Sequence, residues 1–485
     1  MVKPDGRLTH DLDPFDRPPR DGCGVFGVWS PGEDVAKLAY FGLQALQHRG
    51  QESAGIAVSD GSRIVVHKEM GLVAQVFDEP SLTALRGDIA VAHCRYSTTG
   101  APIWANAQPT FRSTPVASVA LGHNGNLTNT RELSDMLTPE AGFGMMHATS
   151  DTDVLTELIV EAAATASSLA DAAAAILPKV RGAYSLVFMD EDTLYAARDP
   201  QGFRPLVLGS LGTRGWVVAS ETAALDIVGA TFVREVQPGE LIVMDERGVR
   251  SRTFAAAVPK TCLFEYVYLA RPDTTIGGRG LHATRVEIGR TLAAEHPAEA
   301  DLVIPVPESG TPAAIGYAEA SGIPYGQGLV KNSYVGRTFI QPSQTIRQLG
   351  IRLKLNPLRD VIEGKRIVVV DDSIVRGNTQ RAIVAMLRES GAREVHVRIA
   401  SPPVKWPCFY GIDFATRDEL IAGHSSVDEI LAAIGADSLG YVSLDGLIAA
   451  TEQPAGSLCR ACFDGEYPLP VAEHERGKDV LEPTH

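Results

Sequence analysis

The stretch VVVDDSIVRGNTQ, residues 368–380, decides how the second half of this chain folds. Three valines predict a buried strand, and two aspartates follow where the strand ends. The next residues form a polar loop, and residues 378–390 have the apolar spacing of a helix that Gly391 ends. A strand that passes through a polar loop into a helix is the unit from which parallel sheets are built.

The same pattern occurs in ADLVIPVPESG, residues 300–310, so the region after residue 262 is predicted to be α/β with a mostly parallel sheet. Such sheets bind ligands at the carboxyl ends of their strands. Side chains that directly follow the apolar runs are therefore the candidates for a binding site.

In residues 368–380 the start of the helix favours a phosphate group, which backbone N–H groups and the hydroxyls of Ser373 and Thr379 could bind. Asp371 and Asp372 suit sugar hydroxyls or a metal ion instead. The spacing and the lysine of the nucleotide-binding P-loop are missing. An ordinary strand–helix turn capped by an aspartate is the simpler alternative, and it accounts for only one of the two acids.

The first half of the chain is predicted to be strand-rich, with helices packed on its sheets. One helix is expected at about 150–165, capped by Ser150. The pattern changes near 255–262. Short apolar or alternating runs recur before that point, among them GVFGVW (24–29), IAVAHCRYST (89–98), ASVALGHNG (117–125) and ELIVMDERG (240–248).

Composition sets limits on the class of protein. A chain of 485 residues is long enough for two or three domains, and 45% hydrophobic residues provide ordinary globular cores. The net charge of −15 argues against general nucleic-acid binding. We find neither a secretory signal nor an apolar run long enough to span a membrane. Six widely spaced cysteines suit a reducing compartment, so the sequence predicts a cytoplasmic protein.

Cys23 lies between two glycines, directly after a segment with little ability to fold. Residues 1–22 hold four prolines, four basic and five acidic residues and no apolar run. Two interpretations remain open at this point. Cys23 is a small buried residue at the start of a strand, or residues 1–22 are removed and Cys23 begins the mature chain.

Four further cysteines suggest a metal centre. Cys459 and Cys462 are separated by two residues, a spacing that binds one centre, and Cys262 and Cys408 could complete a four-thiolate site. Spacing alone permits structural zinc or an iron–sulfur cluster. Unconnected buried cysteines are the alternative for Cys262 and Cys408.

Taken together, these features resemble the glutamine phosphoribosylpyrophosphate amidotransferases, also called amidophosphoribosyltransferases. The likeness extends over residues 23–470, and it is closest to the iron–sulfur, leader-processed branch of the family. The motifs that carry it are CGVFGVW (23–29), LQALQHRGQESAGIAV (43–58), HCRYSTTG (93–100), LGHNGNLTN (121–129), SDTDVL (150–155), RDPQGFRPL (198–206), FEYVYLARPD (264–273), KNSYVGRTFIQPSQ (331–344), VVVDDSIVRGNT (368–379) and CFYGIDFATRDELIA (408–422).

The resemblance implies a domain organisation. Residues 1–22 would be a leader that is removed, and residues 23–258 an N-terminal-nucleophile glutamine amidotransferase domain, an αββα sandwich. Residues 259–470 would form a type I phosphoribosyltransferase domain with a mostly parallel sheet and an iron–sulfur site. Residues 471–485 would be a disordered tail.

The resemblance also assigns a glutamine site. Cys23 would be the nucleophile, with its own α-amine as the base, since that amine has a pKa of about 7.7–8.0. Asn124 and Gly125 would form the oxyanion hole, although an Asn-Gly pair alone is more typical of a tight turn. Arg95 would bind the α-carboxylate of glutamine and Asp151 its amino group, although an acid in the first turn of a helix also balances the helix dipole. Arg49 would support the site.

For the second domain the resemblance implies a site for phosphoribosyl pyrophosphate. Asp371 and Asp372 would bind the ribose hydroxyls and, with Ser309, the magnesium ion. Residues 373–379 would hold the 5′-phosphate. The stretch 331–354 has five basic residues and no acidic one, and it would be a loop that closes over the substrate. The residues assigned to this substrate are Asp371, Asp372, Ser373, Arg376, Gly377, Asn378, Thr379, Lys331, Tyr334 and Arg337.

The reaction implied is the first committed step of purine synthesis. Glutamine would be hydrolysed at Cys23, and the ammonia would pass to phosphoribosyl pyrophosphate, giving 5-phosphoribosylamine, glutamate and pyrophosphate. The resemblance further implies Mg²⁺, a [4Fe–4S] cluster on Cys262, Cys408, Cys459 and Cys462, purine nucleotides as inhibitors, and a homotetramer. Two alternatives remain: another N-terminal-nucleophile amidotransferase, such as a glucosamine-6-phosphate synthase, and a non-catalytic regulator that binds phosphoribosyl pyrophosphate.

Overall fold

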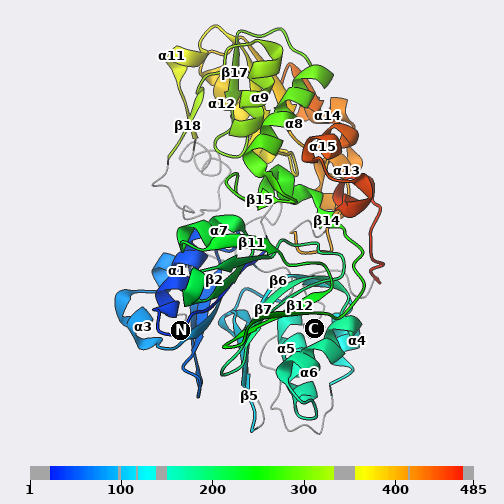
Figure 1. The fold of residues 1–485 in the computed structure, drawn as a ribbon. Coiled ribbons are helices and arrows are strands. Elements are labelled where there is room, and N and C mark those ends of the chain that lie inside the picture. The colour runs from blue at the N-terminus through cyan, green and yellow to red at the C-terminus, as the bar shows by residue number, and fades with distance from the viewer. Residues whose placement is uncertain are drawn as a thin grey trace, which may run out of the picture.

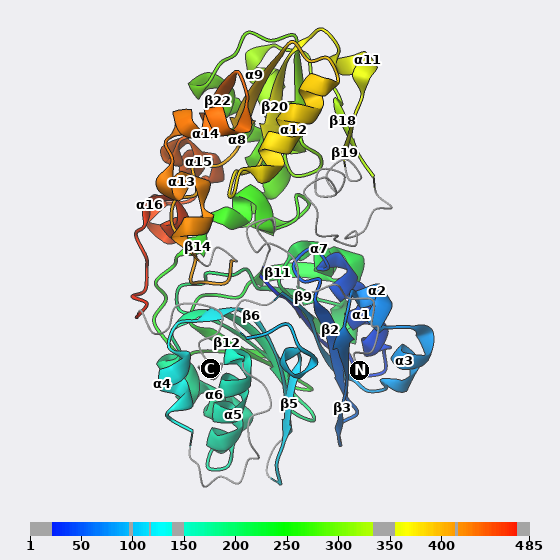
Figure 2. The same ribbon diagram turned by 180° about the vertical axis from the view of Figure 1, so that it is seen from behind.

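The computed structural model describes residues 22–96, 100–115, 118–137, 150–332, 355–412 and 416–472. These residues form two domains, a sheet-rich domain from the first half of the chain and an α/β domain from the second (Figures 1 and 2). The two domains meet near β14, β11 and the loops around them.

The first domain contains two antiparallel sheets that face each other. The seven-stranded sheet has the order β11 (Thr231–Glu235), β9 (Val207–Ser210), β10 (Trp216–Ala219), β1 (Gly24–Trp29), β4 (Ile89–Arg95), β2 (Ser53–Ser59) and β3 (Ile64–Met70). The six-stranded sheet has the order β13 (Gly248–Thr253), β12 (Glu240–Asp245), β8 (Leu194–Arg198), β7 (Gly182–Met189), β6 (Ser118–Leu127) and β5 (Thr110–Ser113).

Three apolar layers hold this domain together. Strand alternation turns Val25, Val91, Val187 and Ile242 into the layer between the sheets. A second layer lies between the seven-stranded sheet and its helices, and a third lies between the six-stranded sheet and its helices. The helices are α1 (Val35–Ala45), α2 (Val73–Val76), α3 (Glu79–Ala84) and α7 (Thr222–Ile227) on the first sheet, and α4 (Thr130–Ser134), α5 (Asp151–Ala163) and α6 (Leu169–Ile176) on the second. The predicted αββα sandwich is confirmed.

Helix α5 begins as its sequence predicts. The Ser150 hydroxyl accepts a hydrogen bond from the backbone N–H of Asp153 at 3.3 Å, which satisfies one of the amide groups left free at a helix start. The cap fixes Asp151 as the first helical residue, on the side of the sandwich that carries β6.

The second domain is built on four parallel strands in the order β17 (Leu302–Pro305), β20 (Arg366–Asp371), β21 (Glu394–Ile399) and β22 (Ser438–Tyr441). One face is covered by α8 (Leu281–Glu295), α9 (Thr311–Ser321) and α15 (Leu444–Thr451), and the other by α11 (Arg359–Ile362), α12 (Asn378–Glu389), α13 (Ile421–His424) and α14 (Val427–Ile434). The predicted parallel sheet of the second half is confirmed. A short ribbon, β18 (Leu329–Lys331) with β19 (Leu355–Pro357), projects from it.

Short elements connect the domains. Strand β14 (Thr261–Cys262) pairs in parallel with β23 (Leu458–Cys459), so the end of the chain returns to the start of the second domain. A π-helix, Glu265–Leu269, follows β14, and α16 (Ala461–Asp464) follows β23. Across the junction, the rings of Phe203 and Tyr410 stack with their centroids 4.3 Å apart. A minor ribbon, β15 (Thr275–Ile276) with β16 (Arg279–Gly280), precedes α8. Within the described residues, no helix is long and apolar enough to cross a membrane.

Candidate active sites

The Cys23 thiol lies directly before β1, the central strand of the seven-stranded sheet. It is buried, and it donates a hydrogen bond to the carbonyl oxygen of Tyr96 at 3.3 Å. Burial raises the pKa of this thiol to about 11, although the charge of Arg95 acts in the opposite direction. A thiol in this state needs a base that removes its proton before it can act as a nucleophile.

Asn124 and Gly125 lie inside strand β6, where they pair with Ser185 and Tyr184 of β7. The tight turn that an Asn-Gly pair alone favours is therefore not formed. Both polar atoms of the Asn124 side chain are buried and have no hydrogen-bond partner in the described part of the chain. A Cβ built on Gly22 would lie 3.0 Å from Asn124 Oδ1, so the Asn124 amide faces the residue next to Cys23. An unpartnered buried amide at this place is available to a bound group.

Gly125 occupies a backbone conformation that other residues rarely adopt. Its φ is +147°, and a Cβ at this position would lie 2.0 Å from the carbonyl oxygen of Ala183. We expect Gly125→Ala to lower glutamine-dependent activity by at least about 100-fold, because the backbone beside Asn124 must move. Ammonia-dependent synthesis, measured in parallel, should remain.

Gly122→Ala is the matched control, since Gly122 lies in the same strand but a Cβ there would meet its nearest neighbour at 3.5 Å, an ordinary contact. It should keep both activities and unfold close to the wild-type temperature. Equal glutamine-dependent activity in the two variants would contradict the importance of the Gly125 backbone.

Arg95 and Asp151 have opposite electrostatic effects on the Cys23 thiol. The charge of Arg95 lowers the pKa of the Cys23 thiol, and the charge of Asp151 raises it. Arg95 is buried, and its two terminal nitrogens donate to the carbonyl oxygens of Ala101 at 3.3 Å and Gly100 at 3.4 Å. The Asp151 carboxylate accepts from the N–H groups of Leu127 at 3.0 Å and Thr152 at 2.8 Å. A cation and an anion fixed near one thiol match the two charged groups of an amino acid.

Sequence reasoning missed a buried polar group behind these residues. His123 Nδ1 is 3.1 Å from the hydroxyl of Thr152, and its Nε2 is 3.1 Å from the Ala183 carbonyl. Gln108 accepts from the His123 backbone N–H at 2.8 Å and donates to the Thr152 hydroxyl at 3.0 Å. These contacts tie β6 to the start of α5, and so they fix Asn124 relative to Asp151.

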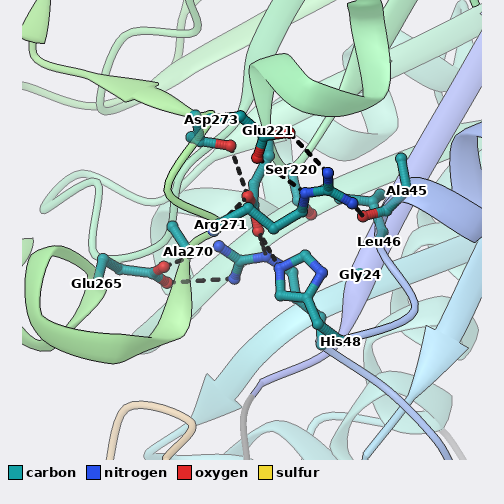
Figure 3. A network of polar contacts seen from close by, with 12 residues as sticks. Gly24, Ala45, Leu46, His48, Ser220, Glu221, Glu265, Ala270, Arg271 and Asp273 are labelled. Atoms are coloured by element: carbon teal, nitrogen blue, oxygen red, sulfur yellow. Dashed lines mark hydrogen bonds and ion pairs between the residues drawn. The ribbon is translucent and has the colours of Figure 1, made fainter. Parts of the chain in front are cut away.

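The Arg49 side chain joins the two domains by binding Glu221 and Glu265, the two acids labelled in Figure 3. Its Nε binds Glu221, and its Nη1 and Nη2 donate to Glu265 at 3.2 and 2.7 Å. Glu221 also accepts from His48 Nε2 at 2.6 Å and from the backbone N–H of Arg271 at 2.9 Å. Arg49, Glu221 and Glu265 are fully buried, so this is an ion network closed to water at the domain junction.

The network keeps its charges despite burial. Burial favours the neutral acid at Glu221, but Arg49 and His48 outweigh it and hold the pKa of the carboxyl well below its usual range. Sequence reasoning did not single out Glu221 or Glu265. An acid inside the apolar run FEYVYLA (264–270) was the available signal for Glu265, because a charged side chain in such a run must have a partner.

The second site lies at the carboxyl end of β20. The Asp371 carboxylate accepts from the backbone N–H of Asp372 at 2.9 Å and binds the side-chain amide of Gln380. The Ser373 hydroxyl donates to Asp372 at 2.6 Å. Burial, and the adjacent acid Asp372, raise the pKa of Asp371 well above its usual range. Two buried acids side by side are costly without a cation or hydroxyl groups to bind, which is typical of a ligand site.

The loop after β20, which was predicted to hold a phosphate, leads directly into α12. Gly377 has a φ of +80° and directly precedes α12, whose first residues are Asn378 and Thr379. The Arg376 side chain forms an ion pair with Glu419, so it is already engaged within the protein. The loop therefore presents the start of α12 next to Asp371 and Asp372.

The loop that holds Ser309 lies against the same strand end. A Cβ built on Gly310 would lie 2.3 Å from the carbonyl oxygen of Val370. The Lys331 ammonium is 3.5 Å from Glu308 in this loop. Tyr334 and Arg337, which were assigned to the same substrate, lie outside the described residues. The end of the parallel sheet thus carries the two acids and the Ser309 loop, and Lys331 of the β18–β19 ribbon reaches that loop.

The four remaining cysteines meet at the domain junction. Cys262 and Cys459 are paired residues on the adjacent strands β14 and β23, and Cys462 follows in α16. Burial raises the pKa of Cys462, and the thiols of Cys262, Cys408 and Cys459 raise it further, so all four sulfurs lie near one another. No disulfide joins them, and the backbone N–H of Tyr410 donates to the Cys408 sulfur at 3.4 Å.

The αββα sandwich with a buried cysteine at the start of its central strand, joined to a parallel sheet with a two-acid phosphate loop, defines a glutamine amidotransferase fused to a phosphoribosyltransferase. A family model of the glutamine amidotransferase domain matches residues 93–226. The amidophosphoribosyltransferase of Mycobacterium bovis is 66% identical over 475 residues, which cover 96% of this chain and 90% of that protein. The Synechococcus elongatus amidophosphoribosyltransferase is 52% identical and covers 98% of both chains.

Solved structures agree. A Bacillus subtilis glutamine phosphoribosylpyrophosphate amidotransferase, complexed with ADP and GMP, superposes with a TM-score of 0.88 at 46% identity and covers 95% of this chain and all of its own. A structure described as the allosteric regulatory enzyme of purine biosynthesis gives a TM-score of 0.89 at 47% identity and covers 95% of this chain and 99% of its own. The chain belongs to the amidophosphoribosyltransferase family, the enzymes of the first committed step of purine synthesis.

Proposed function

We propose that glutamine is hydrolysed at Cys23 and that the ammonia reaches phosphoribosyl pyrophosphate inside the protein. The α-amine of Cys23 takes the thiol proton, and the thiolate attacks the side-chain amide of glutamine. Asn124 and the backbone N–H of Gly125 stabilise the oxyanion. The C–N bond then breaks, which leaves a glutamyl thioester and ammonia, and water releases glutamate.

Arg95 and Asp151 hold the α-carboxylate and α-amino group of glutamine in this proposal. The opposite electrostatic effects of the two side chains on Cys23 support that assignment. Arg49 takes part indirectly, because its partners Glu221 and Glu265 tie the glutamine site to the second domain. A water-excluding junction would keep ammonia neutral and inside the protein.

At the second site Asp371 and Asp372 bind the ribose hydroxyls, and residues 373–379 hold the 5′-phosphate. Ammonia attacks C1 of the ribose, and pyrophosphate leaves. A magnesium ion held by Ser309, Asp371 and Asp372 would neutralise charge on the pyrophosphate. The raised pKa of Asp371 beside Asp372 supports a cation or hydroxyl ligand here. Lys331, Tyr334 and Arg337 are proposed to cover the substrate.

The observation that carries this function is that both halves keep their chemistry: a buried thiol beside an unpartnered amide, and two adjacent acids before a helix start. The test is turnover of glutamine with phosphoribosyl pyrophosphate, in which glutamate, pyrophosphate and phosphoribosylamine should form in equal amounts. A protein that binds phosphoribosyl pyrophosphate without turnover would instead be a non-catalytic regulator.

The proposed base requires a free α-amine, and therefore removal of residues 1–22. Gly22 supports this, since it lies against the proposed oxyanion residue: a Cβ built on it would be 3.0 Å from Asn124 Oδ1 and 3.2 Å from the Gly411 carbonyl oxygen. We expect the intact mass of active enzyme to match a chain that begins at Cys23. Active enzyme that keeps Met1 or Val2 at its N-terminus would contradict removal.

We further propose that Cys262, Cys408, Cys459 and Cys462 hold a [4Fe–4S] cluster. All four thiols are near one another and free of disulfides. The two-residue spacing of Cys459 and Cys462, with Cys262 and Cys408 near them, supports a four-thiolate centre.

The expected result for this site is a brown protein with about four irons per chain when it is purified without oxygen. Cys459→Ser should lose iron and stability together, since Cys459 lies on β23, the strand that pairs with β14. Metal analysis and the visible spectrum measure both. Stoichiometric zinc without iron would contradict the cluster.

Regulation and assembly are proposed by similarity alone. The relatives described as allosteric, or complexed with ADP and GMP, support purine nucleotides as inhibitors of this chain. A homotetramer and a cytoplasmic location are proposed with them. Titration of the activity with purine nucleotides tests the inhibition, and the mass of the protein in solution tests the homotetramer.

A further inference from the structure

Arg204 is a fully buried arginine whose contacts join both domains, although the mechanism above does not use it. It lies in the loop between β8 and β9 and is 1% exposed. Its Nε donates to the carbonyl oxygen of Tyr410 at 3.1 Å, and its Nη1 donates to Glu265 at 3.1 Å. Both partners belong to the second domain.

The third nitrogen of this guanidinium, Nη2, is buried and has no hydrogen-bond partner within the described residues. Its surroundings are backbone. A Cβ built on Gly411 would lie 3.1 Å from Nη2 and 3.0 Å from the carbonyl carbon of Gly125. A Cβ built on Gly22 would lie 3.6 Å from Arg204 Cζ. The unpaired nitrogen therefore lies beside Gly411 and Gly125, and the centre of the same guanidinium lies beside Gly22, the residue bonded to Cys23.

A positive charge at this place acts on whatever occupies the position of the Gly22–Cys23 bond. In the processed chain that group is the α-amine of Cys23, which carries a proton and a charge below its pKa of about 7.7–8.0. Two positive charges at short range in a water-poor site repel each other strongly. The uncharged amine, which accepts the thiol proton, is the form that Arg204 favours.

We propose that Arg204 is a positioning residue for glutamine hydrolysis: its charge keeps the terminal amine of Cys23 in the uncharged, proton-accepting form, and its bonds to Glu265 and Tyr410 hold that charge in place. The proposal rests on the processed N-terminus proposed above. It assigns Glu265 the opposing effect, because a carboxylate bonded to Arg204 partly cancels the charge.

Other charged groups also act on Cys23 and its neighbours, and their effects have both signs. Asp151 and Glu52 raise the pKa of the Cys23 thiol and Arg95 lowers it, and Arg49 lowers that of the adjacent Cys94. Arg204 itself keeps its charge: burial opposes the charge, but Cys262, Glu265 and Cys408 outweigh it and raise the pKa. Among the residues that the structure describes, the charged or titratable groups around the amine are thus Arg49, Glu52, Arg95, Asp151, Arg204 and Glu265, together with the thiols of Cys94, Cys262 and Cys408.

The test measures how the inactivation of the processed holoenzyme by iodoacetamide depends on pH, with glutamine hydrolysis as a second profile. Arg204→Gln should move the acidic limb of both profiles to higher pH by at least about half a unit, a three-fold loss of rate on that limb. Glu265→Gln should move the limb to lower pH. Arg204→Lys keeps the charge, so its limb should stay within about 0.2 unit of wild type.

Arg398→Gln is the control for the loss of a buried arginine, since Arg398 binds backbone carbonyls of the second domain far from Cys23. Its limb should not move. Intact mass is read first: a chain that keeps residues 1–22 contradicts the processing proposal, whereas a processed chain with unmoved limbs contradicts the role of Arg204 alone. If Arg204→Gln does not fold, Glu265→Gln decides, and a limb that stays or rises in that variant overturns the proposal.

Discussion

Cys23→Ala, made in a chain that starts at position 23, is expected to lose glutamine-dependent synthesis by more than about 1000-fold, because no other group replaces the nucleophile. The variant should still make phosphoribosylamine from added ammonium salt, since Asp371 and Asp372 are unchanged. That residual rate should rise with pH as the fraction of free ammonia increases. Assays of the variant with each nitrogen source measure the separation.

Cys94→Ala is the matched control, because Cys94 is also buried in the seven-stranded sheet but its thiol lies in the apolar layer between that sheet and its helices, where it donates to the Leu46 carbonyl at 3.3 Å. It should keep glutamine-dependent activity, with a loss of stability of about 1 kcal/mol. A folded Cys23→Ala variant that binds phosphoribosyl pyrophosphate but is inactive with ammonia would contradict two separate sites.

The double change Asp371→Ala with Asp372→Ala is expected to lower synthesis at least about 100-fold with either nitrogen source, since the ribose and its cation are no longer held. Glutamine hydrolysis should continue slowly, uncoupled from synthesis. Unfolding should not be the cause, because burial disfavours the charge of Asp371 in the folded chain. Glutamate release and pyrophosphate release, measured together, report the two effects.

Asp301→Ala is the control at the opposite end of the same sheet, where Asp301 pairs with Arg366 at 2.9 Å. It should keep both reactions and lose a little stability, as surface ion pairs contribute about 0–1 kcal/mol. Synthesis from ammonia at the wild-type rate in the double variant would show that the two acids do not hold the sugar.

The parallel class of the second domain and its β20–α12 unit could be predicted from local sequence. Strand β20 ends at Asp371 and α12 starts at Asn378, as VVVDDSIVRGNTQ predicts, because an apolar run, a glycine at positive φ and an amphipathic helix act over neighbouring residues. The Ser150 cap of α5 was readable for the same reason. The local Asn-Gly pattern could not predict that Asn124 and Gly125 continue a strand. The pair favours a turn, and only its pairing with Ser185 and Tyr184 in β7 makes it strand.

By itself, the sequence determined that the first half is strand-rich and the second α/β, and it determined the strand–loop–helix unit that carries Asp371 and Asp372, since each depends on residues within about one element. Cys23 became the candidate nucleophile only through the family resemblance. The tertiary structure alone decided what Arg49 and Arg204 touch: Glu265 lies 216 residues from Arg49 and 61 from Arg204, yet one carboxylate binds both. Burying an arginine or a glutamate requires a partner that supplies the opposite charge. Which partner it is depends on how the two domains meet, and no local pattern records that.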